Sequence, residues 1–247
     1  MKYNVLGKSD LKVSNYCLGS MTWGEASNEE TGHWQLDNAK DHGINFVDTA
    51  EMYPTNPMRR KTAGRTEEII GNWLGKRGCR DKIIVATKIT GEGSKTVRNG
   101  DPISKSQLVK SVDKSLKRLK TDYIDLYQLH WPNRGSYHFR KYWNYDASDQ
   151  STDEMDEHVA EITETISDLT ISGKIRAFGL SNESAWGTMK FLRASIHKPK
   201  ARIVSIQNEY SLLCRLFDTD LAELCHHENV KLLAFSPLGA GLLTGKY

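Results

Sequence analysis

The sequence predicts an α/β fold, a (β/α)8 barrel that begins with a β-hairpin and here lacks its eighth strand and the helices beyond it. Strand-like and helix-like segments alternate along the chain with mostly short connections, which indicates a parallel sheet. Polar side chains come at the ends of successive predicted strands, where a barrel places its chemistry. An open dinucleotide-binding sheet would instead carry a glycine-rich turn after its first strand, and Gly19-Ser20-Met21-Thr22-Trp23-Gly24 does not fit that pattern.

The hairpin is expected in residues 2–14, where apolar segments flank the turn-forming residues 7–10. Strands are then predicted at Tyr16–Gly19, Asn45–Asp48, Lys82–Lys88, Tyr123–Leu129, Ile175–Leu180, Ile203–Gln207 and Val230–Phe235. Apolar residues spaced three and four apart predict helices between them, from about Asn28 to His42, near Thr66–Lys76, after the capping box at Ser104, around Val159–Leu169, and over Ala185–Ser195 and Phe217–Asn229. No eighth strand is found, so the first and seventh strands are expected to be open edges. We interpret residues 1–247 as a single barrel domain that is incomplete at its C-terminus.

Composition excludes several classes of protein. The chain has 247 residues, of which 38% are hydrophobic and 26% charged, as in ordinary globular proteins. Its net charge of +3 argues against a nucleic-acid or membrane surface. No apolar run reaches the ~18–20 residues that cross a bilayer, and no signal-peptide core follows Met1, so we expect a cytoplasmic protein. The sequence is also compatible with a homo-oligomer.

The cysteines give no sign of a disulfide framework or a metal site. The four are scattered, and no CxxC pair occurs among them, which indicates reduced thiols. Cys225-His226-His227 brings ligand-type residues together in sequence, but adjacent residues on a helix point in different directions. We therefore expect no metal.

Four polar residues at or just after successive strand ends predict a carbonyl-reducing site. Asp48 ends the second strand, Tyr53 lies in the loop beyond it, Lys88 ends the third strand and His130 follows the fourth. A tyrosine hydroxyl has an ordinary pKa of about 10, and a lysine cation beside it stabilises the phenolate and eases proton donation. A carboxylate would keep that lysine charged and oriented, and a histidine would hydrogen-bond the substrate oxygen. Tyr53 is therefore the predicted proton donor, with Asp48 serving Lys88.

Each of these residues has an ordinary structural explanation when taken alone. Asp48 suits a helix N-cap, Lys88 a solvated strand end, His130 a packed core histidine and Tyr53 a packed loop aromatic. Their joint placement at successive strand exits favours the catalytic interpretation.

Residues 131–155 interrupt the regular alternation and are rich in aromatic side chains. A connection of this length inside a compact domain usually has a function or is disordered. We expect it to be an active-site loop that covers the mouth and shapes substrate choice. The alternative is packing against neighbouring helices or a partner.

Longer motifs support this interpretation. They are Val47–Pro54, Ser115–Pro132, Gly173–Arg176 with Gly179–Glu183, Ile206–Asn208 with Tyr210–Leu213, and Leu243–Tyr247. The chain from Lys2 to Tyr247 resembles the aldo-keto reductase superfamily, and within it the Tas-type aldo-keto reductases. The resemblance implies a (β/α)8 (TIM) barrel that reduces the carbonyl group of a small molecule with NADPH. It also implies that Asp48, Tyr53, Lys88 and His130 are the catalytic tetrad.

The same resemblance implies a set of cofactor-binding residues. By that match Ser181, Asn182 and Gln207 hold the nicotinamide carboxamide, and Phe235 stacks on the nicotinamide ring. The other implied contacts are Ser20, Met21 and Asp48 beside the cofactor, Ser236, Leu238 and Gly241 along the pyrophosphate with Pro237 next to them, and Lys246 at the adenosine 2′-phosphate. Backbone amides of a glycine-rich loop together with one lysine form a suitable anion site.

The sequence supports an NADPH-dependent oxidoreductase that converts aldehydes or ketones to alcohols. Two alternatives remain at this stage: a nucleotide-binding regulatory subunit resembling the potassium-channel β subunits, and an inactive, truncated reductase. The complete tetrad favours catalysis. Members of the family continue through an eighth strand and further helices, which contribute contacts to the adenosine phosphate.

Overall fold

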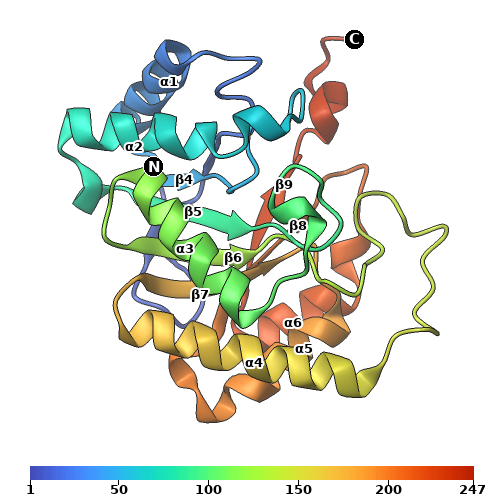
Figure 1. The fold of residues 1–247 in the computed structure, drawn as a ribbon. Helices are drawn as coiled ribbons and strands as arrows, with labels where there is room; N and C mark the ends of the chain where they lie inside the picture. The colour runs from blue at the N-terminus through green and yellow to red at the C-terminus, as the bar shows by residue number, and fades with distance from the viewer.

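The computed structural model describes residues 1–247 as a small hairpin and a curved parallel sheet with helices on its outer side (Figure 1). The hairpin pairs β1 (Tyr3–Val5) with β2 (Lys12–Ser14) in antiparallel register. The parallel sheet has the order β3-β4-β5-β6-β7-β8-β9. Its strands are β3 (Leu18–Gly19), β4 (Phe46–Asp48), β5 (Ile84–Ile89), β6 (Ile124–Leu129), β7 (Ile175–Ser181), β8 (Ile203–Glu209) and β9 (Lys231–Phe235).

This sheet confirms the predicted α/β fold with an N-terminal hairpin. Every strand pairs in parallel with its neighbour in the sequence, as in a (β/α)8 barrel. β3 and β9 do not pair with each other, so the seven strands form an open barrel. No helix of the chain is long and apolar enough to cross a membrane.

Six α-helices connect the strands and lie on the outer face of the sheet (Figure 1). They are α1 (Glu29–Asp41), α2 (Arg65–Arg77), α3 (Lys105–Leu119), α4 (Thr152–Ile171), α5 (Ala185–Ala194) and α6 (Asp220–Glu228). Helices α1, α3, α4 and α5 begin after polar N-cap residues whose side chains accept a backbone N–H of the first turn, namely Asn28, Ser104, Ser151 and Ser184. The irregular connection after β6 therefore ends at Ser151, and residues 152–155, which we expected in the loop, belong to α4.

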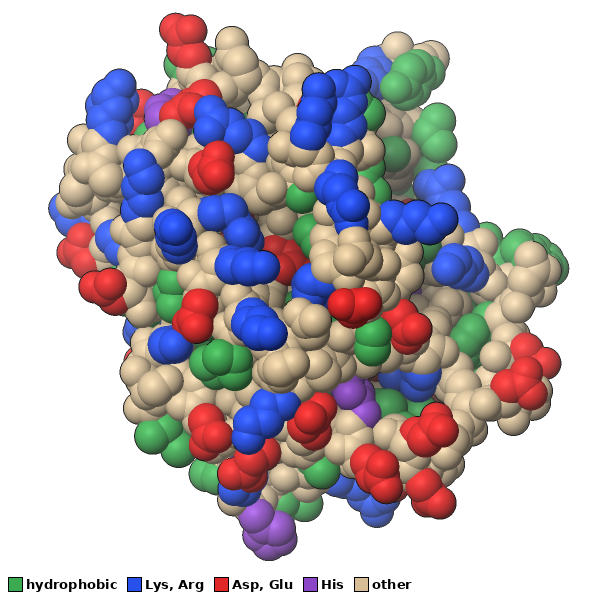
Figure 2. Space-filling view, viewed as in Figure 1, with side chains coloured by type: hydrophobic (Ala, Val, Ile, Leu, Met, Phe, Trp, Pro, Cys, Tyr) green, Lys and Arg blue, Asp and Glu red, His purple; other side chains and the backbone are tan.

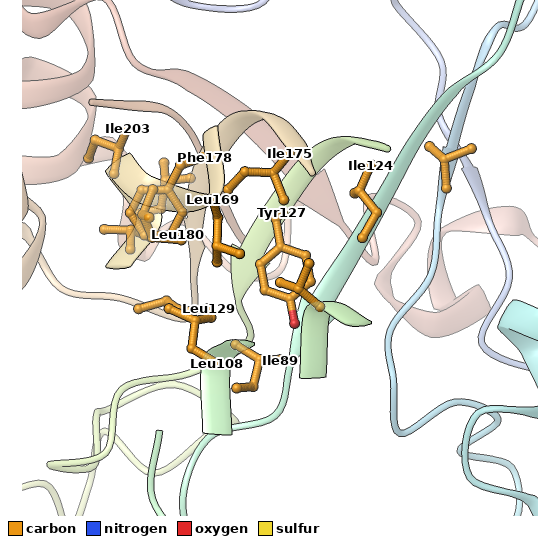
Figure 3. Close-up of a cluster of buried hydrophobic side chains, with 14 of the residues drawn as sticks. Ile89, Leu108, Ile124, Tyr127, Leu129, Leu169, Ile175, Phe178, Leu180 and Ile203 are labelled. Atoms are coloured by element: carbon orange, nitrogen blue, oxygen red, sulfur yellow. The ribbon is translucent and has the colours of Figure 1, made fainter. Parts of the chain in front are cut away.

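The main hydrophobic core lies between the sheet and these helices (Figure 3). Outward-facing strand residues such as Tyr127 and Phe178 pack there against helix residues such as Leu108 and Leu169. A second, smaller cluster of eight buried residues joins Leu6, Leu11 and Val13 of the hairpin region to residues of the opposite strand face. The hairpin thus closes the N-terminal end of the barrel, which leaves the carboxyl ends of the strands for the functional site.

A buried carboxylate also ties the strands together near their N-terminal ends. Asp125 is 1% exposed and accepts hydrogen bonds from the backbone N–H of Val85 at 2.9 Å and from Arg176 at 2.9 Å. Arg80 forms an ion pair with it at 2.7 Å and stacks over the ring of Tyr123, 3.9 Å from the centroid. Such a carboxylate links β5, β6 and β7 because its donors come from both neighbouring strands and the turn before β5.

Candidate active site

The carboxyl ends of β4 and β5 bring Asp48 and Lys88 into direct contact. Lys88 Nζ donates to Asp48 Oδ2 at 2.5 Å and to the carbonyl oxygen of Thr49 at 2.8 Å. Lys88 is fully buried and Asp48 is 8% exposed, so Lys88 is not the solvated strand-end residue that it could have been. A charge at this depth requires a close counter-charge and further hydrogen bonds.

The second oxygen of Asp48 supplies those further bonds. Asp48 Oδ1 accepts from Gln207 Nε2 at 3.0 Å and from Gln128 Nε2 at 3.2 Å. Ser20, in the loop after β3, donates its hydroxyl to the Asp48 carbonyl at 2.7 Å. The carboxylate is thus held by donors from β5, β6 and β8, namely Lys88, Gln128 and Gln207, while Ser20 holds the Asp48 backbone.

Tyr53 and His130 complete the cluster. The centroid of the Tyr53 ring lies 5.1 Å from Lys88 Nζ. The Tyr53 and His130 rings meet edge to face, with centroids 5.7 Å apart. His130 Nδ1 is buried and has no hydrogen-bond partner within the protein. The structure therefore brings the predicted Asp48, Tyr53, Lys88 and His130 together at one end of the barrel.

Burial and charge set the protonation states of this cluster. Burial raises the pKa of the Tyr53 hydroxyl by more than the Lys88 cation lowers it, so the phenol carries its proton at neutral pH. Burial lowers the pKa of Lys88, but the Asp48 carboxylate and Tyr53 offset this and hold it above its usual range. Burial, with the Lys88 charge, lowers the pKa of His130 well below its usual value, so the imidazole is neutral. The cluster combines a protonated phenol, a cation and a neutral imidazole.

Buried amide groups line the next two strand ends. Ser181 and Asn182 follow one another at the end of β7, and Ser181 Oγ donates to the Gln207 carbonyl at 2.8 Å. Asn182 Nδ2 donates to the His130 carbonyl at 2.9 Å, while Asn182 Oδ1 is buried without a partner. Asn208 Oδ1 is likewise unpaired. Buried amide oxygens are normally hydrogen-bonded, so the unpaired Asn182 Oδ1 suits a ligand that presents an N–H donor, whereas Asn208 alternates with Gln207 along β8 and points to the opposite face.

The loop after β9 carries the residues that we expected at the far end of a dinucleotide. Phe235 ends β9, and the loop continues into the 3₁₀ segment η7 (Gly239–Thr244). Gly241 has a φ of 102°, which favours glycine, and a Cβ at this position would lie 3.2 Å from Lys246 Nζ. Glycine thus leaves room for the Lys246 side chain to fold back over the loop. Met21 and Leu238 are 49% and 55% exposed, so both are accessible to a ligand.

Gln128 belongs to this cluster and was not predicted from the sequence. It is fully buried in β6 and donates to Asp48. The alternation of side chains along a strand contains the signal, since Gln128 lies two residues before His130 and therefore points to the same face. A polar residue at that position of a buried strand indicates a hydrogen-bonding partner inside the barrel.

A cavity of about 370 Å³ lies beside this cluster rather than at it. Its walls come from the loops after β5 and β6, the start of α4 and the end of β7. They include Arg134, His158 and Ser181 but none of the four clustered residues. Figure 2 shows a hollow between acidic side chains near the first turns of α4. The chemistry of the buried ion pair, not cavity volume, identifies the candidate site.

Comparison with known proteins defines the class first. Residues 15–247 match the aldo/keto reductase family. The chain is 43% identical over its whole length to "Protein tas" of Escherichia coli, of which it covers 71%. Over its whole length it is also 33% identical to "Uncharacterized oxidoreductase YrpG" of Bacillus subtilis, of which it covers 69%. It is 30% identical over its whole length to "Aldo-keto reductase YhdN" of the same organism, of which it covers 65%. The chain therefore belongs to the aldo/keto reductase family of oxidoreductases.

Proposed function

We propose that the protein reduces small aldehydes or ketones to alcohols with NADPH, and that Tyr53 is the proton donor. The observation that carries this proposal is the buried Lys88–Asp48 pair next to Tyr53 and His130. A structural role alone would not require a buried cation beside a protonated phenol and a neutral imidazole. Membership of the aldo/keto reductase family supports the same reaction class.

The side chains divide the work of carbonyl reduction. When bound, NADPH supplies a hydride to the carbonyl carbon. Tyr53 donates its hydroxyl proton to the carbonyl oxygen as negative charge develops there, and Lys88 stabilises the phenolate that remains. Asp48 holds Lys88 in place. Neutral His130 orients the carbonyl oxygen toward Tyr53 by a hydrogen bond. A general acid in the position of Tyr53 contributes a factor of roughly 10²–10⁴ to the rate.

The unpaired amide oxygen of Asn182 supports a nicotinamide site at the ends of β7 and β8. The carboxamide N–H groups of the ring would donate to Asn182 Oδ1 and to the oxygen of Gln207, whose Nε2 already donates to Asp48. Ser181 lies next to both, and Phe235 at the end of β9 offers an aromatic face to the ring.

The loops beside the site would hold the rest of the cofactor. The backbone N–H groups of Leu238 and Ala240, which make no hydrogen bond within the loop, and the Lys246 cation suit the pyrophosphate and the adenosine 2′-phosphate. Ser20 and Met21 directly follow β3, the edge strand opposite β9. Lys246 is thus the residue that favours NADPH over NADH.

Replacing Tyr53 with phenylalanine tests the assignment of the acid. NADPH binding, followed by cofactor fluorescence, is expected to be retained, while turnover of a panel of small aldehydes falls by about 10²-fold or more. Tyr16→Phe is the matched control, because Tyr16 is 68% exposed. Full activity in Tyr53→Phe would refute the role of Tyr53 as proton donor. Failure of the unmodified protein to bind NADPH would refute the proposed cofactor.

A further inference from the structure

Glu51 is a buried carboxylate that the proposed reaction does not use. It lies two residues before Tyr53 and is 6% exposed. Its Oε1 accepts the backbone N–H of Thr90 at 2.7 Å and also pairs with the Arg98 guanidinium. Its Oε2 accepts the hydroxyl of Ser111 on α3. One side chain thus connects the turn after β4 to the residue that follows β5, to the loop between β5 and α3, and to α3 itself.

The backbone around Glu51 links this carboxylate directly to the candidate site. The Glu51 N–H donates to the carbonyl of Lys88 at 3.1 Å. The Tyr53 N–H donates to the Ala50 carbonyl at 3.0 Å, which closes the turn that contains Glu51. The Tyr53 carbonyl accepts the N–H of Gly64 at 2.9 Å. A shift of Glu51 would therefore move the turn that carries the phenol relative to the strand that carries the cation.

Arg98 holds the other side of this carboxylate. It lies in the loop between β5 and α3, its side chain is 9% exposed, and it donates both to Glu51 and to the carbonyl of Thr90. Arg98 and Asn99 have φ values of 49° and 57°. Non-glycine residues rarely adopt this left-handed conformation, and it persists where the surrounding contacts determine it. The loop is thus shaped to deliver the guanidinium to Glu51.

We propose that the Glu51–Arg98 pair positions Tyr53 against Lys88, so that both are positioning residues for proton donation. This inference rests on the proposed function and adds to it a contact outside the tetrad. The pair spans two loops of the barrel mouth, and it fixes the turn on which the acid lies. Small displacements of a reacting group of about 1 Å can cost on the order of 10²-fold in rate, so loosening this turn reduces turnover without removing any reacting group.

The variants are Glu51→Gln, Arg98→Met and the conservative Arg98→Lys. Loss of the pair is expected to lower kcat by about 10-fold to 10²-fold, with KM and the NADPH dissociation constant within about twofold, because no ligand contact is removed. Arg98→Lys restores part of kcat, since it returns the charge but not the two-armed geometry. The matched control is Glu25→Gln with Arg59→Met, an ion pair at 3.5 Å in the neighbouring loops in which Arg59 is half-exposed.

A second readout does not depend on turnover. In protein labelled with 3-fluorotyrosine, the ¹⁹F resonance of Tyr53 is identified as the one that Tyr53→Phe deletes. It is expected to shift or broaden in Glu51→Gln and Arg98→Met and to stay in place in the control pair. An unmoved Tyr53 resonance together with unchanged kcat would overturn the proposal. If Glu51→Gln does not fold, the two Arg98 variants decide the question.

The two readouts also separate this inference from the reaction itself. If the unmodified protein reduces no carbonyl compound, the proposed function fails, and the ¹⁹F spectra still determine whether the pair positions Tyr53. If the unmodified protein is active and the kcat losses match only the unfolded fraction measured by circular dichroism, the pair stabilises the fold and the positioning role is refuted.

Discussion

Replacing Asp48 with asparagine removes the charge that keeps Lys88 ionised in the protein interior. Lys88 is fully buried, and its ammonium donates only to Asp48 and to the Thr49 carbonyl. In the variant, burial still lowers the pKa of Lys88, but the carboxylate that opposes burial is gone. The ammonium must then either stay charged without a counter-charge or release its proton.

The second option sets an upper limit on the cost. Releasing a proton at pH 7 from a lysine with an ordinary pKa of about 10.4 costs roughly 5 kcal/mol, because each pH unit corresponds to about 1.4 kcal/mol. Removing one partner of a buried ion pair lowers the free energy of unfolding by about 3–5 kcal/mol, which is in the same range. The cost falls to roughly 2 kcal/mol at pH 9, since less free energy is needed to deprotonate the lysine there.

The sign of the pH dependence follows from linkage. In the Asp48→Asn protein the folded state binds fewer protons at Lys88 than the unfolded state, so its stability rises with pH up to the ordinary lysine pKa. In the unmodified protein the pKa of Lys88 is raised, so Lys88 carries its proton in both states between pH 7 and 9 and adds no slope.

Urea denaturation followed by tryptophan fluorescence at pH 7 and pH 9 measures both quantities. The double variant Asp48→Asn with Lys88→Met is the control, because it has neither charge and is expected to lose the additional pH dependence. A loss below about 1 kcal/mol that is equal at both pH values would refute the reasoning, because it would mean that Lys88 reaches water or another anion without Asp48.

Two further predictions concern stability. Burial lowers the pKa of His130 and of His138, so below pH ~6.5 the unfolded chain binds more protons than the folded protein. The free energy of unfolding therefore falls with decreasing pH, by up to about 1.4 kcal/mol per pH unit for each histidine. Urea denaturation from pH 7.5 to 5 measures this dependence, and a free energy of unfolding that does not change with pH would contradict it. On α2, a Cβ on Gly71 would lie 2.7 Å from the backbone of Leu119, whereas one on Gly75 meets nothing within 4 Å. Gly71→Ala is therefore expected to cost about 1–3 kcal/mol and Gly75→Ala to gain about 0.5–1 kcal/mol, and equal denaturation midpoints would contradict the close approach of α2 and α3.

Local signals in the sequence were sufficient to predict the order of the strands and helices. β-branched runs, as in β5, and polar N-caps such as Ser104 depend on neighbouring residues alone, so they can be recognised without the fold. The boundary between the aromatic loop and α4 was predicted at residue 155 instead of Ser151, because Ser151 resembles the polar loop before it. Its role as N-cap is decided by its bond to the N–H of Glu154.

The candidate site was accessible to prediction because a parallel barrel converts sequence position into spatial position. A residue at the end of one strand must lie near the residue at the end of the next, so Asp48, Lys88 and His130 could be grouped without coordinates. The balance of charges could not be obtained in this way. The lysine was expected to lower the pKa of Tyr53, and it does act in that direction, but burial of the phenol outweighs it.

The sequence by itself determined the alternation of strands and helices, the family motifs and the four residues of the candidate site. The tertiary structure alone decided how deeply the Lys88–Asp48 pair is buried, which amide oxygens are left unpaired, and that Arg98 reaches Glu51 across 47 residues of chain. The physical reason is the range of the forces involved. Helix caps and strand propensities act between neighbours, whereas desolvation and ion pairing depend on every segment that the fold packs around a charge.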